Sequence, residues 1–299
     1  MNSDKPQRVG DYELHQAWEG FFSVRQISSG EIMHSRTEPM DEARRLYVEQ
    51  SRLADRLREE SRAGEPLVIW DVGLGAAANA MAAMDCFEAT PSARPLHIVS
   101  FENDLDSLRL VVANSERFPS LRSDAANAII TSREWRSVDG ALTWTLLEGD
   151  FVEQIDKAPK PSLIFYDMFS TKTSARLWGV AVFRKLFQAL GDRAAELFTY
   201  TCSTANRAAL LAAGFFVARG RNAGVKVETT IALTPAALHL ASNPSRELLS
   251  AEWLAKWERS AAKYPADISP NERPAFQNSV RLHEQFRKSR GPERLPSIT

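Results

Sequence analysis

Short apolar runs alternate with helix-like segments through the middle of the chain. The segments between several runs carry apolar residues at helical spacing, which predicts strands that alternate with helices. This alternation favours an α/β fold with a mainly parallel sheet and helices on both faces. Two last runs predict an antiparallel pair, which completes a seven-stranded sheet. The predicted strands cover 67–71, 96–102, 142–147, 162–167, 196–201, 215–218 and 225–233.

The two ends of the chain have different patterns. Turn residues between 12 and 33 predict short antiparallel strands, and 39–63 has apolar residues at helical spacing. Near the other end, 251–264 predicts an amphipathic helix with Trp253 and Trp257 on one face. We therefore expect N-terminal strands and a helix over 1–63, the sheet domain over 64–235, and a helical and irregular extension over 236–299.

Composition narrows the classes of protein. The 37 Lys and Arg balance 38 Asp and Glu, and 44% of residues are hydrophobic, which excludes whole-chain disorder. The missing basic surplus argues against a simple nucleic-acid binder. The first residues resemble no signal peptide, and no apolar run approaches the ~18–20 residues that span a bilayer. Two cysteines and five scattered histidines offer no metal-ligand spacing. We expect a cytoplasmic protein with no membrane segment and no metal.

A glycine turn follows the first strand of the predicted sheet. Gly73 and Gly75 let a ligand approach the backbone, and the helix that follows presents free N–H groups. Glu102 ends the next strand, where an acid accepts both hydroxyls of a ribose. The turn therefore predicts a nucleotide-type cofactor.

Three acids at strand ends favour S-adenosylmethionine (SAM) over a dinucleotide. Asp71 precedes the glycines, where it would repel a pyrophosphate but suits the ammonium of SAM. Asp150 follows the third strand, where the adenine amino group of SAM would lie. The alternative is that Asp71, Glu102 and Asp150 are ordinary helix N-caps.

Asp167 ends the fourth strand and therefore faces the ligand crevice of such a sheet. A carboxylate there can bind the N–H groups of an amine acceptor and stabilise the cation that forms on methylation. Phe169 and Trp178 could wall the acceptor pocket, or they could belong to the core.

Several segments, in this order and spacing, resemble the MnmC-like methyltransferases, the SAM-dependent half of the tRNA 5-methylaminomethyl-2-thiouridine biosynthesis enzyme. The resemblance runs from about residue 10 to 235. Its segments are 30–35, Pro39, 42–43, 46–51, Leu53, 71–75, Asn79, 149–150, Asp167, Phe169, Trp178, 199–203, 213–215 and 224–228.

The resemblance implies a Rossmann-like class I methyltransferase that methylates an aminomethyl group on the wobble uridine of tRNA, with the anticodon stem-loop as partner. We expect this chain to lack an FAD-binding oxidase half, so a separate protein would supply any oxidase step. The implied catalytic residue is Asp167, and Phe169, Trp178 and Lys226 would bind the substrate. The implied cofactor residues are His34, Ser35, Gln50, Asp71, Gly73, Gly75, Asn79, Glu102, Asp150 and Asp167.

One departure from the family pattern bears on the acceptor. Thr171, Ser174 and Ala175 stand in the loop after Asp167 where the family has a proline-rich stretch, so we expect a less rigid loop. This leaves open another amine acceptor: a small molecule, another RNA site or a protein. A non-catalytic binding protein that holds a partner through Trp253 and Trp257 is a further alternative. For tRNA, the candidate phosphate contacts include Arg176, Lys185, Arg207, Arg219 and Arg281.

Overall fold

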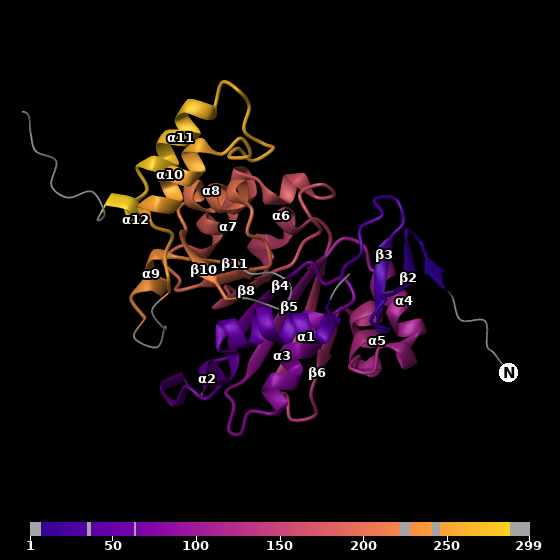
Figure 1. The fold of residues 1–299 in the computed structure, drawn as a ribbon. Helices are drawn as coiled ribbons and strands as arrows, with labels where there is room; N and C mark the ends of the chain where they lie inside the picture. Colours follow the sequence, from indigo (N-terminus) through magenta and orange to yellow (C-terminus); the bar gives the residue numbers. More distant parts are fainter. Residues whose placement is uncertain (1–6, 35–36, 63, 222–227, 241–245, 288–299) are drawn as a thin grey trace, which may run out of the picture.

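The computed structural model contains one large sheet with helices on both faces (Figure 1). The strand order is β10-β11-β9-β8-β4-β5-β7-β6. Strands are present in all seven predicted ranges, although 225–227 of the last range lie outside the described residues, and the closing pair β10 and β11 is antiparallel as expected. A short antiparallel strand, β6, extends the edge beside β7. The structure describes residues 7–34, 37–62, 64–221, 228–240 and 246–287. The strand bounds are β4 Leu67–Val72, β5 Leu96–Glu102, β6 Glu134–Arg136, β7 Leu142–Glu148, β8 Leu163–Tyr166, β9 Glu196–Thr199, β10 Phe216–Gly220 and β11 Thr229–Leu233.

Each face of the sheet has its own apolar core, because neighbouring residues of a strand point to opposite faces. Ile69 packs in the core shared with α3 and α5, whereas Trp70 packs in the core shared with α6, α7 and α8. The helices alternate with the strands along the chain, as predicted. Their bounds are α3 Ala78–Glu88, α4 Asp106–Ala113, α5 Ser123–Ser132, α6 Phe151–Gln154, η5 Ala175–Trp178, α7 Val180–Leu190 and α8 Thr204–Ala213.

A separate three-stranded antiparallel sheet forms near the N-terminus, in agreement with the turn pattern there. It consists of β1 Arg8–Val9, β2 Tyr12–Gln16 and β3 Phe22–Gln26. Tyr12 and Val24 of this sheet form a small apolar cluster with Leu110 and Val111 of α4. This cluster fixes the N-terminal sheet against α4, beside the large sheet.

The predicted helix over 39–63 is interrupted. Arg52 has a φ of +55°, a left-handed conformation that ends one helical segment before the next begins. Apolar spacing alone could not reveal this break, because apolar residues continue at a similar spacing on both sides. The segments are α1 Pro39–Ala43, η1 Arg44–Glu49, α2 Leu53–Leu57 and η2 Glu60–Arg62.

Three C-terminal helices, α10, α11 and α12, pack on the α7–α8 face of the large sheet, whereas Ala237 of α9 belongs to the core on the other face (Figure 1). Trp253 and Trp257 lie on one face of α10, as predicted, and both are buried in the core of this same chain. Gln285 hydrogen-bonds the backbone of Val217 in the edge strand β10. Within the described ranges, no helix is both long and apolar enough to cross a membrane. The helices are α9 Pro235–Leu238, α10 Ala251–Arg259, α11 Arg273–Arg281 and α12 Glu284–Arg287.

Candidate functional site

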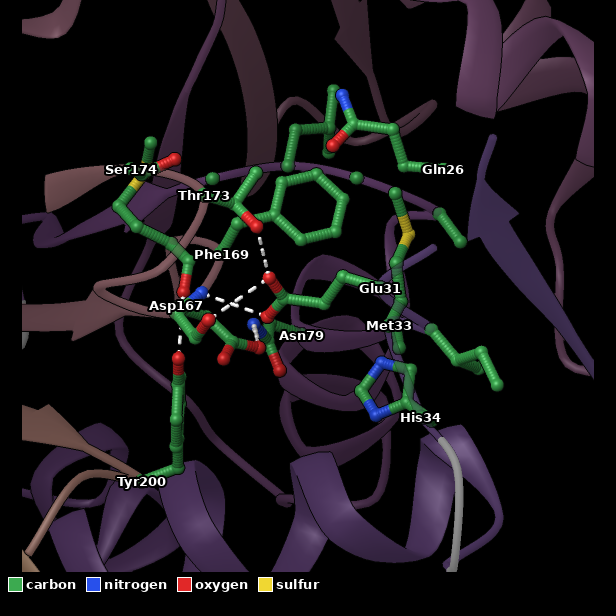
Figure 2. Close-up of a pocket in the computed structure, with 18 of the residues that line it drawn as sticks. Gln26, Glu31, Met33, His34, Asn79, Asp167, Phe169, Thr173, Ser174 and Tyr200 are labelled. Carbon is green, nitrogen blue, oxygen red and sulfur yellow. Dashed lines mark hydrogen bonds between the residues drawn. The ribbon is translucent and has the colours of Figure 1, made fainter. Parts of the chain in front are cut away.

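A cavity of about 520 Å³ lies where β4, β5 and β8 end, within the usual size range of small-molecule sites. It is lined by the glycine turn, the ends of β5 and β8, the loop after β8, and the segment after β3 (Figure 2). The site therefore joins residues that are far apart in the sequence. Of the predicted site residues, it contains His34, Gly73, Gly75, Asn79, Glu102, Asp167 and Phe169.

The glycine turn is required by a close backbone contact. Gly73 has a φ of +91°, and a Cβ atom there would lie 2.7 Å from the backbone oxygen of Asp167. Gly75 also has a positive φ, of +52°. Only glycine adopts such conformations at little cost, so the turn both shapes the cavity and lets the end of β8 approach it.

Glu102 is held at the end of β5 by backbone groups. Its Oε2 accepts a hydrogen bond from Gly75 N at 3.1 Å, and its Oε1 accepts bonds from Asn103 N and Asp104 N. Burial raises the pKa of this carboxyl, and these hydrogen bonds oppose the rise. The carboxylate is thus fixed at the cavity wall beside the glycine turn.

Asn79 connects the turn to Asp167. Its Nδ2 donates a hydrogen bond to Asp167 Oδ2 at 2.9 Å (Figure 2). The side chain is 5% exposed, and Asn79 Oδ1 has no hydrogen-bond partner among the described residues. A buried amide oxygen that lines a cavity in this state is suited to a ligand that donates a hydrogen bond.

Asp167 lies in the cavity wall but is surrounded by protein. Burial raises the pKa of its carboxyl, while the nearby His34 and the hydrogen bonds from Asn79 and Tyr47 lower it. Tyr200, from the end of β9, lines the same wall and donates a hydrogen bond to Met168 O at 3.0 Å.

The cavity wall is strongly acidic. Glu31, Glu42, Glu102 and Asp167 all line it, and none of its described lining residues is Lys or Arg. His34 Nδ1 lies 3.1 Å from Glu42 Oε2. A wall of this composition favours a cationic or N–H-donating ligand over an anionic one.

The chain is similar to known methyltransferases in sequence. Residues 116–235 match a family model described as S-adenosyl-L-methionine-dependent methyltransferase. The tRNA 5-methylaminomethyl-2-thiouridine biosynthesis bifunctional protein MnmC of Burkholderia mallei is 28% identical over 201 residues, and that of Chromobacterium violaceum is 26% identical over 220 residues. These alignments cover 62% and 66% of this chain.

The chain is a SAM-dependent methyltransferase. It is related to the methyltransferase half of MnmC and spans about 30% of the length of these curated relatives. Its fold is also similar to the crystal structure of MnmC2 from Aquifex aeolicus, with a TM-score of 0.64 and 20% identity over 92% of this chain and 85% of that one. The α/β, Rossmann-like fold expected from the sequence is confirmed.

The cavity fits the chemistry of SAM. The Oδ1 atom of Asn79 can accept a hydrogen bond from the cofactor's ammonium, and the acidic wall suits its two positive charges. Glu102 is placed beside the glycine turn, where ribose hydroxyls are bound in folds of this class. The residues that line the cavity are therefore compatible with SAM as the cofactor.

Asp71 occupies a different place from the one expected. Its side chain is fully buried and does not line the cavity. The sheet register pairs Asp71 with Ser100 on β5, and Ser100 Oγ donates a hydrogen bond to Asp71 Oδ2 at 2.8 Å. Burial raises the pKa of Asp71 to about 7. In this position Asp71 has no direct contact with a ligand in the cavity.

Gln50 and Asp150 also lie outside the cavity lining. Gln50 Oε1 accepts hydrogen bonds from Arg221 N and Thr229 Oγ1, so it fixes the ends of β10 and β11. Asp150 caps α6 by accepting a hydrogen bond from Val152 N, and it forms an ion pair with Arg176. The N-cap alternative therefore describes Asp150.

The two predicted aromatic residues differ in position. Phe169 lines the cavity and packs against the cluster that contains Tyr12 and Val24. Trp178 is 2% exposed and lies in the core, where its Nε1 donates a hydrogen bond to Phe169 O at 2.7 Å. Trp178 therefore supports the loop after β8 and does not reach a substrate in the cavity.

Two predicted site residues, Ser35 and Lys226, lie outside the described residues. The lining residues that were not predicted include Glu31, Glu42 and Tyr200. Glu31 and Glu42 belong to the segments that carry the family resemblance, so their acidity was a usable signal. Tyr200 follows a strand end, which was also a usable signal.

The five candidate phosphate contacts named above form ion pairs within the chain. Arg207 is 4% exposed and pairs with Glu228 at 2.5 Å, so it is not available to bind a phosphate. The more exposed candidates also form ion pairs within the chain: Arg176 with Asp150, Lys185 with Asp156, Arg219 with Glu228 and Glu247, and Arg281 with Glu258.

Proposed function

We propose that the methyltransferase transfers the methyl group of SAM to an amine, and that this amine is the aminomethyl group of a modified wobble uridine of the 5-aminomethyl-2-thiouridine type in tRNA. The acidic cavity wall around Asp167 carries this proposal, because carboxylates favour an amine acceptor. The names of the MnmC relatives support the choice of uridine.

SAM, when bound, supplies an electrophilic methyl group on a sulfonium. Glu102 would accept the ribose hydroxyls, and Asn79 Oδ1 would accept a hydrogen bond from the ammonium. Asp167 would accept an N–H of the acceptor amine, orient its nitrogen and stabilise the positive charge that develops there. The raised pKa makes Asp167 a better proton acceptor than an ordinary carboxylate.

Methylation of undermethylated tRNA tests this proposal. The protein is incubated with SAM and tRNA from a strain that lacks this methylation, and the nucleosides are separated by mass. We expect the wobble nucleoside to gain one methyl group, with no gain in fully modified tRNA. No methylation of the wobble nucleoside would refute the proposed substrate.

A different amine acceptor is the second candidate, since Thr171, Ser174 and Ala175 alter the loop beside Asp167. Transfer of a labelled methyl group to small amines, bulk RNA or protein, without labelling of the wobble nucleoside, would support it. The alternative of a non-catalytic binding protein required Trp253 and Trp257 to form a surface for a partner. Both side chains are buried in the core of this chain, so they do not form such a surface.

We further propose that residues 1–63 complete the cofactor site of the sheet domain 64–235, and that 236–299 is a packing extension. The expected partner is the anticodon stem-loop of tRNA. A separate protein would supply any FAD-dependent oxidase step. A tRNA substrate also favours a cytoplasmic location.

A further inference from the structure

Glu31 joins the N-terminal part of the chain to the loop after β8. Its Oε1 accepts a hydrogen bond from Ser170 N at 2.8 Å, and its Oε2 accepts one from Ser170 Oγ at 2.9 Å. Thr173 Oγ1 also donates to Oε2. We name this arrangement of Glu31, Ser170 and Thr173 the Glu31 clamp.

The clamp lies over the cavity. All three of its residues line the cavity, and Figure 2 shows the Glu31 carboxylate between Thr173 and the Asn79–Asp167 pair. The clamp residues are about 140 positions apart in the sequence, so they join the segment after β3 to the loop after β8. These are two separate parts of the cavity wall.

The root of the same loop is held by other contacts. Trp178 Nε1 donates to Phe169 O, and Tyr200 donates to Met168 O. Loss of the clamp would therefore leave Asp167 to Phe169 anchored and release the stretch from Ser170 to Thr173. A substitution of Glu31 should therefore loosen residues 170–173, of which Ser170 and Thr173 line the cavity, and leave Asp167 and Phe169 in place.

The clamp contributes more than an ordinary surface contact. A charged acceptor strengthens each of its hydrogen bonds, and hydrogen bonds to charged groups are about twice as strong as neutral ones. The loop has no proline between Asp167 and Trp178 to restrain it. Hydrogen bonds to Glu31 provide the restraint instead.

We propose that Glu31 is a positioning residue, which holds residues 170–173 closed over the bound cofactor and so limits the release of SAM and of its product, S-adenosylhomocysteine. This inference rests on the cofactor assignment and not on the identity of the acceptor. It therefore can be tested by binding alone.

The test compares E31Q, T173V and the double variant with the full-length protein. Glutamine keeps the shape of Glu31 but cannot accept on both sides, and valine removes the Thr173 donor. We expect S-adenosylhomocysteine to dissociate roughly tenfold faster from each single variant by stopped flow, as loss of one charge-assisted bond predicts. The Ser170 amide should also exchange its hydrogen faster in E31Q.

Non-additivity identifies the clamp. Because the two side chains act through one contact, the double variant should release product little faster than the faster single variant. E13Q is the matched control, since Glu13 lies in the same N-terminal part and pairs with Arg25 away from the cavity. It should match the unaltered protein, and E31D should restore part of the slow release.

Additive effects, or product release unchanged in both single variants, would overturn the proposal. T173V carries the test by itself if E31Q fails to fold, as judged by its circular dichroism. If the unaltered protein binds neither SAM nor S-adenosylhomocysteine, the cofactor assignment fails and the inference fails with it. If binding is normal but no tRNA is methylated, only the proposed acceptor is refuted.

Discussion

Asn79 Nδ2 donates a hydrogen bond to Asp167 Oδ2 across 2.9 Å, which joins the first turn of α3 to the end of β8. One side chain thus contacts the acid proposed to bind the acceptor, lines the cofactor cavity, and has a buried oxygen, Oδ1, with no partner among the described residues. The bond holds the two halves of the site in alignment. Alignment of the reacting groups is a main source of rate enhancement in transfer reactions.

Asp167→Asn should separate binding from turnover. Asparagine keeps the size of the side chain but removes the charge that would stabilise the methylated amine. We expect the Kd for SAM to change less than about threefold and kcat to fall at least about 100-fold. Calorimetry with SAM and single-turnover methylation of undermethylated tRNA measure the two quantities.

Asp156→Asn is the control for this variant, because Asp156 is exposed and lies outside the cavity lining. It should leave both quantities unchanged. Full activity in Asp167→Asn would remove Asp167 from the mechanism.

Glu102 and Asp150 should differ in their effect on cofactor affinity. Both were predicted to bind SAM, but Glu102 lines the cavity, whereas Asp150 is engaged with α6 and Arg176. Glu102→Gln removes a charged acceptor, so we expect SAM to bind about 10- to 100-fold more weakly. Asp150→Asn should change the Kd less than about twofold. Calorimetry on both variants decides the matter, and the opposite ranking would contradict this account of the site.

The alternation of strands and helices, the glycine turn, and the positions of Glu102 and Asp167 at strand ends were predictable because each depends on local sequence. A strand end and a glycine-rich turn fix their own position in a parallel sheet. The direction of Asp71 was not predictable, because all six residues of β4 are buried and the strand shows no alternation of polar and apolar positions. Nothing local indicates which face an acid in such a strand will occupy.

Gln50 and Trp178 were misplaced for another reason. Both side chains form hydrogen bonds that support the structure. The partner of Gln50 is Thr229, which is distant in sequence, and the partner of Trp178 is the backbone oxygen of Phe169, which lies on an irregular loop. A single sequence contains no pattern for such contacts. The resemblance identified segments that matter but could not separate residues that touch a ligand from residues that support the site.

Gly73→Ala should disturb the site through the backbone. The new Cβ would lie 2.7 Å from Asp167 O and 3.0 Å from Met168 Sδ, so the loop after β8 must shift. We expect weaker SAM binding and a lower Tm. Gly140→Ala is the matched control, since Gly140 has a φ of +72° but nothing within 4 Å of its Cβ position.

The control isolates the cost of the backbone conformation, about 1–2 kcal/mol. Gly73→Ala should lower the free energy of unfolding by more than this, measured by urea denaturation. Equal losses in the two variants, with SAM binding intact, would show that the contact with Asp167 does not matter.

Asp71 should make stability depend on pH. Its pKa is about 7 in the folded chain, against an ordinary value of 3.8 in the unfolded chain, so the folded state holds the additional proton between these values. The free energy of unfolding should therefore fall as pH rises from about 4 to about 7 and then become level, with a total loss of at most about 4 kcal/mol from this group.

Asp71→Asn should remove this slope, because asparagine does not titrate and its amide oxygen can still accept the hydrogen bond from Ser100. Urea denaturation of both proteins at a series of pH values gives the difference directly, so that titrations elsewhere in the chain cancel. The variant should be the more stable protein above pH 7, and the two curves should converge towards pH 4. Parallel curves would mean that Asp71 is ionised in the folded chain at all these pH values, and that the buried carboxylate is stabilised by a partner other than Ser100.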